Sequence, residues 1–174
     1  MTDTPGTKTY DGVLGAIPYA YRRTDSRLCR WYVVVGSLLA VGVAVVFALA
    51  IVSILGQTAG TRGGFLTSTR TFYVLIALLF VGPLLAPTLA VARRHRHGTS
   101  DRRYDTAMAA SGFLFVLSLY LGLIASMPPS FRGSTGDSLF APLIEVFYAI
   151  PEAGAPTLPI LAVLVMYLVH RHFR

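Results

Sequence analysis

The chain has 174 residues, of which 54% are hydrophobic and only 13% are charged, and its formal net charge is +7. Soluble domains carry about 25% charged residues, so this chain has too few polar side chains to cover a surface in water and is predicted to lie in a membrane. Its 14 arginines and single lysine bracket long apolar runs. That distribution indicates a membrane surface as the partner of the basic residues and argues against nucleic acid.

The N-terminal segment, residues 1–30, is predicted to be cytoplasmic and partly interfacial. Its first residues, MTDTPGTKTYDG, lack the apolar stretch of a signal peptide. Further on, Val13, Leu14, Ile17 and Tyr21 can share one face of a helix that Asp11 can cap. We expect this segment to lie on the lipid headgroups.

Three long apolar runs follow, and none of them contains a charged residue. A helix needs about 20 apolar residues to cross the roughly 30 Å hydrocarbon core of a bilayer. We therefore predict transmembrane helices over residues 31–55, 72–92 and 106–127.

The last apolar region, residues 139–169, is interrupted by two glutamates and four prolines. As a single helix it would be about 46 Å long and would fit only with a strong tilt. We predict a short interfacial or re-entrant helix over residues 138–150 and a fourth span over residues 151–170, with Pro151 in the first turn, where proline is tolerated. The predicted fold class is all-α, an integral membrane four-helix bundle made by residues 31–174.

The basic residues also predict the orientation of the spans. Twelve Lys and Arg residues lie before the first span, between the second and third, or after the fourth, and three lie on the other side. Because cytoplasmic loops are enriched in Lys and Arg, we predict a multi-pass protein of the cell membrane with both termini in the cytoplasm. The arginines expected to contact anionic headgroups there are Arg22, Arg23, Arg27, Arg30, Arg93, Arg94, Arg96, Arg102, Arg103, Arg171 and Arg174.

Small residues spaced four apart predict how the spans pack. Lipid is as apolar as leucine, so spans associate where small side chains let two backbones approach closely. The first three spans each carry such a stripe: Gly36, Ala40, Ala44 and Ala48; Gly82, Ala86 and Ala90; Ser118, Gly122 and Ser126.

The four histidines form two His-x-His pairs, His95 with His97 and His170 with His172, all on the predicted cytoplasmic side. Residues two apart on a helix point about 200° apart, and the neighbouring arginines repel a divalent cation. We therefore predict no metal site and no cofactor, and we interpret the histidines as part of the basic rim.

Glu145 and Glu152 are the acidic residues of the last apolar region and would share a face if one helix continued through both. A charge at membrane depth costs at least ~2.5 kcal/mol and is often functional. With Tyr148 between them, these residues are the candidate ion or proton site. The alternative is that both glutamates lie in the outer headgroup region.

Residues 10–36, YDGVLGAIPYAYRRTDSRLCRWYVVVG, resemble the opening of small multi-span membrane proteins from salt-loving archaea. The strong preference for Arg over Lys is similar to that of such high-GC genomes. The resemblance implies a membrane location and a span count, and it implies no activity.

No nucleotide-binding loop, HExxH, GxSxG or paired CxxC motif occurs in the chain. We therefore predict no catalytic residues and do not expect an enzyme. The favoured function is a non-enzymatic structural, accessory or partner-binding bundle, whose partner is a second copy or another membrane protein. The alternative is a small oligomeric transporter or channel that uses Glu145 or Glu152.

Overall fold

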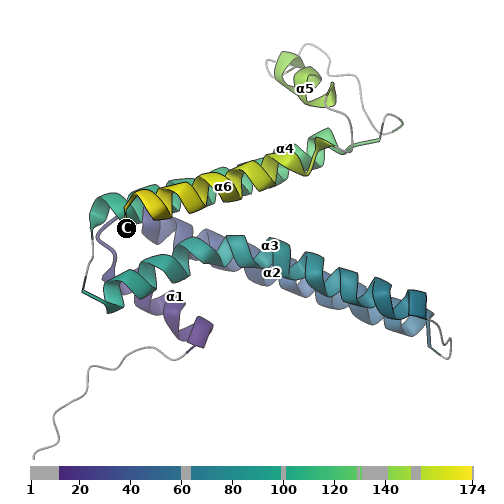
Figure 1. Cartoon of the computed structure of the whole chain (residues 1–174), viewed down its shortest axis with the longest axis horizontal. Coiled ribbons are helices and arrows are strands. Elements are labelled where there is room, and N and C mark those ends of the chain that lie inside the picture. The colour runs from purple at the N-terminus through teal and green to yellow at the C-terminus, as the bar shows by residue number, and fades with distance from the viewer. Residues whose placement is uncertain are drawn as a thin grey trace, which may run out of the picture. The chain divides into compact units, whose positions relative to one another are not determined.

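The computed structural model describes residues 12–59, 64–98, 101–128, 130, 141–149 and 154–173, and every regular element among them is helical (Figure 1). The all-α class is therefore confirmed for the described residues. The helices are α1 (Gly12–Arg23), α2 (Arg27–Gln57), α3 (Gly64–Arg96), α4 (Arg102–Ala125), α5 (Ala141–Tyr148) and α6 (Thr157–His172). The chain divides into two compact units, residues 1–109 and residues 110–174.

Three helices are long and apolar enough to cross a membrane: α2, α3 from Ser68 onward, and α4. They contain the first two predicted spans and most of the third, and they continue beyond the apolar runs into the arginine-rich ends. Hydropathy marks only the apolar part of a helix, whereas arginine is itself a good helix former. The predicted helices are confirmed, and their composition favours a membrane location.

The last described helix begins later in the chain than the predicted fourth span. The helix α6 begins at Thr157, and Gly154–Pro156 form a short turn before it. Pro156 disfavours helical backbone at the residue that precedes it, so the helix cannot extend back through Ala155. With 16 residues, α6 is about 24 Å long, which is less than a hydrocarbon core of about 30 Å. The predicted start at Pro151 lies outside the described residues.

The short helix predicted before the last span is confirmed in its described part, since α5 lies within residues 138–150. A separate, tight contact follows it in the second unit. A Cβ added at Gly122 of α4 would lie 3.3 Å from the Ala155 carbonyl oxygen and 3.7 Å from Pro159 Cδ. Gly122 therefore lets α4 approach the backbone that leads into α6.

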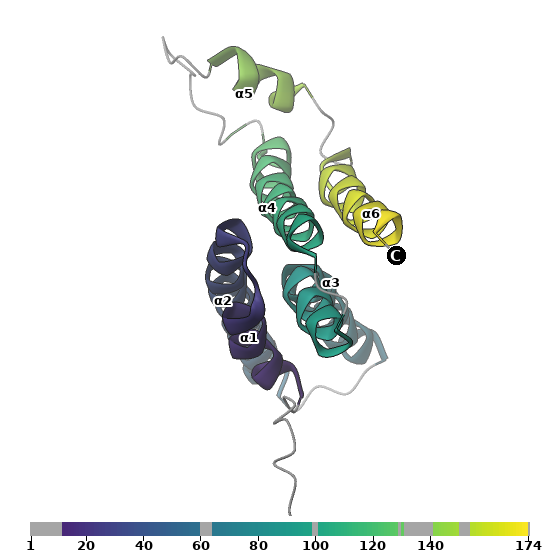
Figure 2. The ribbon, with the colours of Figure 1, turned by 90° about the vertical axis from the view of Figure 1, so that its left-hand side faces the viewer.

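In the first unit α1 packs against both α2 and α3, as the two views show (Figures 1 and 2). Ala16 and Ala20 of α1 are completely buried, one turn apart on the same face. Small side chains at this face let α1 lie close to the longer helices.

The helices α2 and α3 are joined by a cross-helix hydrogen bond. Tyr32 on α2 donates its hydroxyl to the Leu84 carbonyl oxygen on α3 over 2.8 Å. A Cβ at Gly36 would lie 3.0 Å from Tyr32 Cζ and 3.4 Å from that same oxygen. Gly36 therefore makes room for the tyrosine ring between the two helices.

The predicted small-residue stripes pack only in part. Gly36 and Ala40 are buried, as are Ser118 and Gly122. The other ends of these two stripes are exposed, and a Cβ at Gly82 would meet nothing within 4 Å. Small residues permit close approach, but the partner helix decides which of them are used. The stripe members that are exposed are Ala44, Ala48, Gly82 and Ser126.

Candidate functional site

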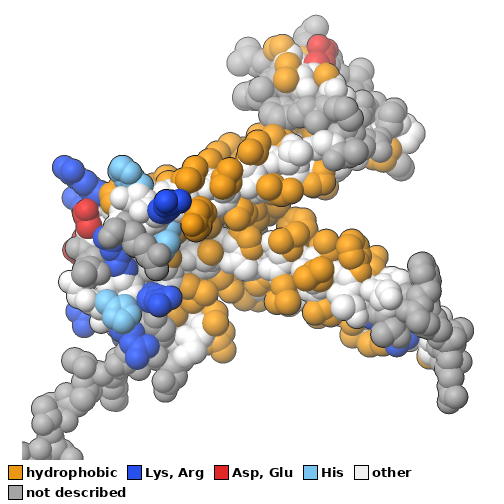
Figure 3. All heavy atoms as spheres, in the orientation of Figure 1, with side chains coloured by type: hydrophobic (Ala, Val, Ile, Leu, Met, Phe, Trp, Pro, Cys, Tyr) orange, Lys and Arg blue, Asp and Glu red, His pale blue; other side chains and the backbone are white. Residues whose placement is uncertain are grey.

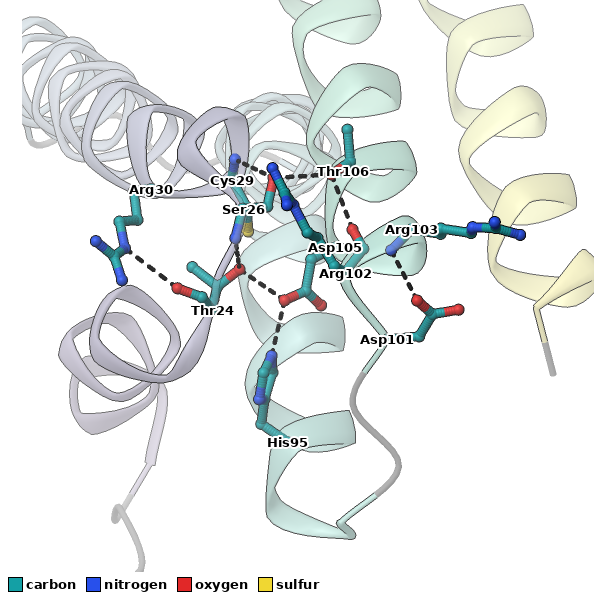
Figure 4. Close-up of polar contacts among 10 residues, drawn as sticks. All are labelled: Thr24, Ser26, Cys29, Arg30, His95, Asp101, Arg102, Arg103, Asp105 and Thr106. Carbon is teal, nitrogen blue, oxygen red and sulfur yellow. Dashed lines mark hydrogen bonds and ion pairs between the residues drawn. The ribbon is translucent and has the colours of Figure 1, made fainter.

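A cluster of buried polar side chains joins three segments of the first unit (Figure 4). We call it the polar clasp; its members are Thr24, Ser26, His95, Asp105 and Thr106. Thr24 and Ser26 lie between α1 and α2, His95 is in the last turn of α3, and the other two are in the first turns of α4. The clasp therefore ties the α1–α2 linker to the end of one long helix and the start of another.

Asp105 is the centre of the polar clasp and is only 1% exposed. Its Oδ2 accepts a hydrogen bond of 2.6 Å from the Thr24 hydroxyl and lies 2.8 Å from His95 Nε2, whose side chain is 6% exposed. Its Oδ1 is buried without a hydrogen-bond partner among the described residues. A buried carboxylate is costly unless it is paired, so Thr24 and His95 are needed to hold it there.

The turn between α3 and α4 explains how His95 meets Asp105. Gly98 adopts a left-handed backbone, φ +72°, which ends α3 in the manner that glycine favours. Asp101 then accepts a hydrogen bond of 2.9 Å from the Arg103 backbone N–H, which caps the start of α4. The end of α3 and the start of α4 lie close enough for His95 to reach Asp105. Helix dipoles favour a cation at the C-terminal end of a helix such as α3 and an anion at the N-terminal end of a helix such as α4.

The linker before α2 is held by a second set of hydrogen bonds. Ser26 is the N-cap of α2, and its Oγ accepts from the Cys29 backbone N–H over 3.3 Å. The same Oγ lies 2.8 Å from Thr106 Oγ1 on α4. Thr24 Oγ1 accepts from the Ser26 backbone N–H over 3.2 Å, and Arg30 Nε donates to the Thr24 carbonyl oxygen over 3.1 Å. Each linker residue of the clasp thus contacts α4 and also ends or starts a helix.

The arginines predicted to meet lipid are exposed where the structure describes them, with one exception. Arg94 is half-buried, and its guanidinium lies 4.1 Å from the centre of the Tyr104 ring, a cation–π contact. Basic side chains gather around the ends of α2 and α3 beside the polar clasp, and hydrophobic side chains cover the helices beyond them (Figure 3). Arg174 lies outside the described residues.

The histidines do not behave as one group. His97 and His172 are exposed, which fits the interpretation of a basic rim, and His170 is half-buried. His95 instead turns inward and pairs with Asp105. Among the residues that the structure describes, no three His, Cys, Asp or Glu side chains gather as metal ligands. The prediction of no metal site remains a prediction.

The predicted ion or proton site is described only in part. Glu145 is exposed on α5, and Tyr148 is half-buried with its hydroxyl 3.8 Å from Met127 Sδ. Glu152 lies outside the described residues. Whether Glu145 lies in the membrane or in the outer headgroup region stays a prediction.

Sequence reasoning missed Asp105 and Thr24 as site residues. Asp105 directly precedes the span predicted over residues 106–127, so the apolar pattern alone does not mark it. One signal was available: Asp105 follows His95 by ten residues across a turn that contains Gly98. Thr24 offered no comparable signal, because its partner is 81 residues away.

All members of the polar clasp direct their polar atoms toward one another, and Thr24, Ser26 and Asp105 are at most 2% exposed. Such an arrangement fixes helices in place and fits a positioning role.

Sequence comparison shows the family of the chain. The chain belongs to the family described as a domain of unknown function, DUF8056, which matches residues 1–174. No curated protein and no solved structure matches the chain. The resemblance to proteins of salt-loving archaea is confirmed only as far as membership of a family of unknown function.

Proposed function

We propose that this protein is a non-enzymatic, multi-pass membrane bundle with a structural, accessory or partner-binding role. The observation that carries the proposal is the separation of side-chain types along the long helices. Apolar side chains remain exposed along most of α2 and α3, while arginines are concentrated at the helix ends beside the polar clasp. An exposed apolar surface of this extent is stable in lipid and unstable in water.

The basic end belongs on the cytoplasmic side of the cell membrane in this proposal. Its exposed arginines would contact anionic headgroups at about 1 kcal/mol each. The partner of the bundle would be a second copy or another membrane protein. The exposed small residues of α2, among them Ala44 and Ala48, support this partner because they allow a further helix to approach closely.

Transport through Glu145 has less support. A membrane-embedded carboxylate would be shielded from solvent among the spans, whereas Glu145 is exposed on a helix of eight residues. Among the acidic residues that the structure describes, Asp105 is the buried one, and it joins helix ends. We therefore favour the bundle over the transporter.

The experiment that tests the proposal labels the two ends of α2. The natural thiol, Cys29, is only 1% exposed and would react poorly from either side. We would replace it by alanine and introduce Asp25→Cys or Gln57→Cys, both at exposed positions that flank or end α2. A membrane-impermeant maleimide should label Gln57→Cys in intact cells and Asp25→Cys only in inside-out vesicles.

The paired design separates two kinds of failure. Labelling of Asp25→Cys from outside, with Gln57→Cys protected, would show the opposite orientation. Labelling of both positions from the same side would show that α2 does not cross the membrane, and the proposed function would fail.

A further inference from the structure

The helix α1 presents three distinct faces, and the structure accounts for two of them. Ala16 and Ala20 are completely buried against the unit that α1 shares with α2 and α3. On another side Arg23 lies over the Tyr19 ring, 5.8 Å from its centre, and the neighbouring Arg22 is also exposed. Basic side chains on that edge suit water and lipid phosphates.

The third face is apolar and uncovered. At roughly 100° per residue, Val13, Ile17, Tyr21 and Leu14 form one arc between the buried alanine face and the basic edge. Leu14 is 83% exposed, and Val13 and Tyr21 are each about half exposed. Packing therefore uses the small residues of α1, covers Ile17 in part and leaves Val13, Leu14 and Tyr21 exposed.

The polar clasp restricts rotation of α1 about its own axis and so determines the direction in which this apolar arc faces. The Thr24 backbone N–H bonds to the Ala20 carbonyl oxygen over 3.0 Å at the end of α1. The same residue donates its hydroxyl to Asp105 over 2.6 Å. The last turn of α1 is thereby attached to α4, so the rotation of α1 about its own axis is set by the buried carboxylate.

We infer that α1 is an interfacial helix that inserts its Val13–Leu14–Tyr21 arc into the lipid leaflet at the basic end, in an orientation that the polar clasp sets. The inference rests on the proposed function, because the leaflet must surround α2 and α3. Two observations favour lipid as the occupant: the arc exposes large apolar side chains, as do the long helices against which α1 packs, and the basic edge of α1 complements anionic headgroups.

The test uses tryptophan as a depth reporter. Trp31 is the only tryptophan, so Trp31→Phe gives a silent background for three single reporters in the full chain. Leu14→Trp reports the apolar arc, and Tyr19→Trp is the matched control on the other side of α1. Leu49→Trp, at a position 64% exposed in α2, reports membrane insertion of the long helices. Each protein is reconstituted in anionic vesicles that contain lipids brominated on the acyl chains.

We expect quenching at Leu49→Trp and at Leu14→Trp, with Leu14→Trp quenched at least about twofold more than Tyr19→Trp. Thr24→Val, which removes the hydroxyl donor to Asp105, should reduce that difference because α1 can then roll. Asp101→Asn, which changes only an exposed cap of α4, should leave the difference unchanged. Circular dichroism and the Leu49→Trp signal would establish that the Thr24 variant is still folded and inserted.

Quenching at Leu49→Trp with equal quenching at Leu14→Trp and Tyr19→Trp would overturn the inference and leave the proposed function intact. So would a Leu14→Trp that is shielded both from brominated lipid and from aqueous iodide, since a protein partner would then cover the arc. An unchanged difference in Thr24→Val would remove the role of the clasp. If Leu49→Trp is not quenched, the proposed function fails and the inference fails with it.

Discussion

Asp105 is held by two polar contacts, one with the Thr24 hydroxyl and one with the His95 ring, and both use the same carboxylate oxygen. Removal of one partner from a buried polar pair is more costly than the pair is stabilising, because the remaining group loses its compensation. Substitution of Asp105 is therefore expected to destabilise the first unit, although the residue is not part of an apolar core.

We expect Asp105→Ala to reduce the free energy of unfolding by about 3 kcal/mol, because it leaves Thr24 and His95 buried without their common acceptor. The matched control is Asp101→Ala, which removes only an exposed helix cap and should cost about 1 kcal/mol or less. Denaturant or thermal unfolding in detergent measures both. Equal effects of the two variants would show that the clasp contributes no more than an ordinary cap.

Gly36 is the second residue whose identity the structure explains. Gly36→Ala should destabilise by about 1–3 kcal/mol, because the new Cβ would crowd a Tyr32 ring that its hydrogen bond to Leu84 holds in place. Gly42→Ala on the same helix should be neutral or stabilising, since a Cβ there meets nothing within 4 Å. Thermal unfolding of the two variants compares them directly. If Gly42→Ala were the more harmful change, α2 would pack through its other face.

At the scale of helices, the contact between α4 and the segment before α6 depends on a backbone, which cannot move aside as a side chain can. A Cβ at Gly122 would lie 3.3 Å from the Ala155 carbonyl oxygen. Substitution here should therefore separate the two elements, whereas a glycine in open space should tolerate a side chain.

We expect Gly122→Val to destabilise the protein by about 2 kcal/mol and to raise proteolysis in the second unit. Gly82→Val on α3 is the control, because a Cβ at Gly82 meets nothing within 4 Å. Limited proteolysis of the reconstituted proteins, read by mass spectrometry, gives the sites of new cleavage. Equal protection of both variants would contradict a close approach at Gly122.

The helix α5 yields a different expectation because its charged residue is exposed. Glu145→Gln should change the free energy of unfolding by less than about 0.5 kcal/mol, as is usual for a surface substitution. A clear increase in stability would instead indicate a glutamate held among spans, where low dielectric penalises its charge. That result would favour the alternative function, the transporter, over the bundle.

At the scale of the whole molecule, the basic residues are concentrated at the end of the first unit that carries the clasp (Figure 3). Arg93, Arg96, Arg102 and Arg103 are exposed there, whereas Arg94 stacks on Tyr104 and also supports the fold. The charge can therefore be reduced without disturbing the buried contacts.

We predict that replacing these four exposed arginines by glutamine lowers the selectivity of the protein for anionic lipid, at about 1 kcal/mol per charge. Spin-labelled phosphatidylserine and phosphatidylcholine in vesicles measure that selectivity. Added salt should lower the selectivity of the parent protein and have less effect on the variant. Arg70→Gln, at the opposite end of α3, serves as the control and should not change it. Selectivity that survives the fourfold replacement would exclude these arginines as the lipid contacts.

The amino-acid sequence by itself determined the helical class and the positions of three long apolar helices. This was possible because the length and hydropathy of a run are local properties that require no knowledge of its neighbours. It did not indicate the turn before Thr157, which ends in a proline, because hydropathy alone does not register backbone restrictions.

Only the tertiary structure decided which polar residues matter. In sequence, His95 was one of four histidines in a basic rim and Asp105 was the residue before an apolar run; in the fold they form one buried pair. Thr24 joins them from 81 residues away. Pairing of this kind depends on how the helices pack. The packing determines which hydrogen-bond donors lie close enough to reach a buried carboxylate. The spacing of His95 and Asp105 around Gly98 is a weak local signal, whereas the sequence around Thr24 does not indicate its partner.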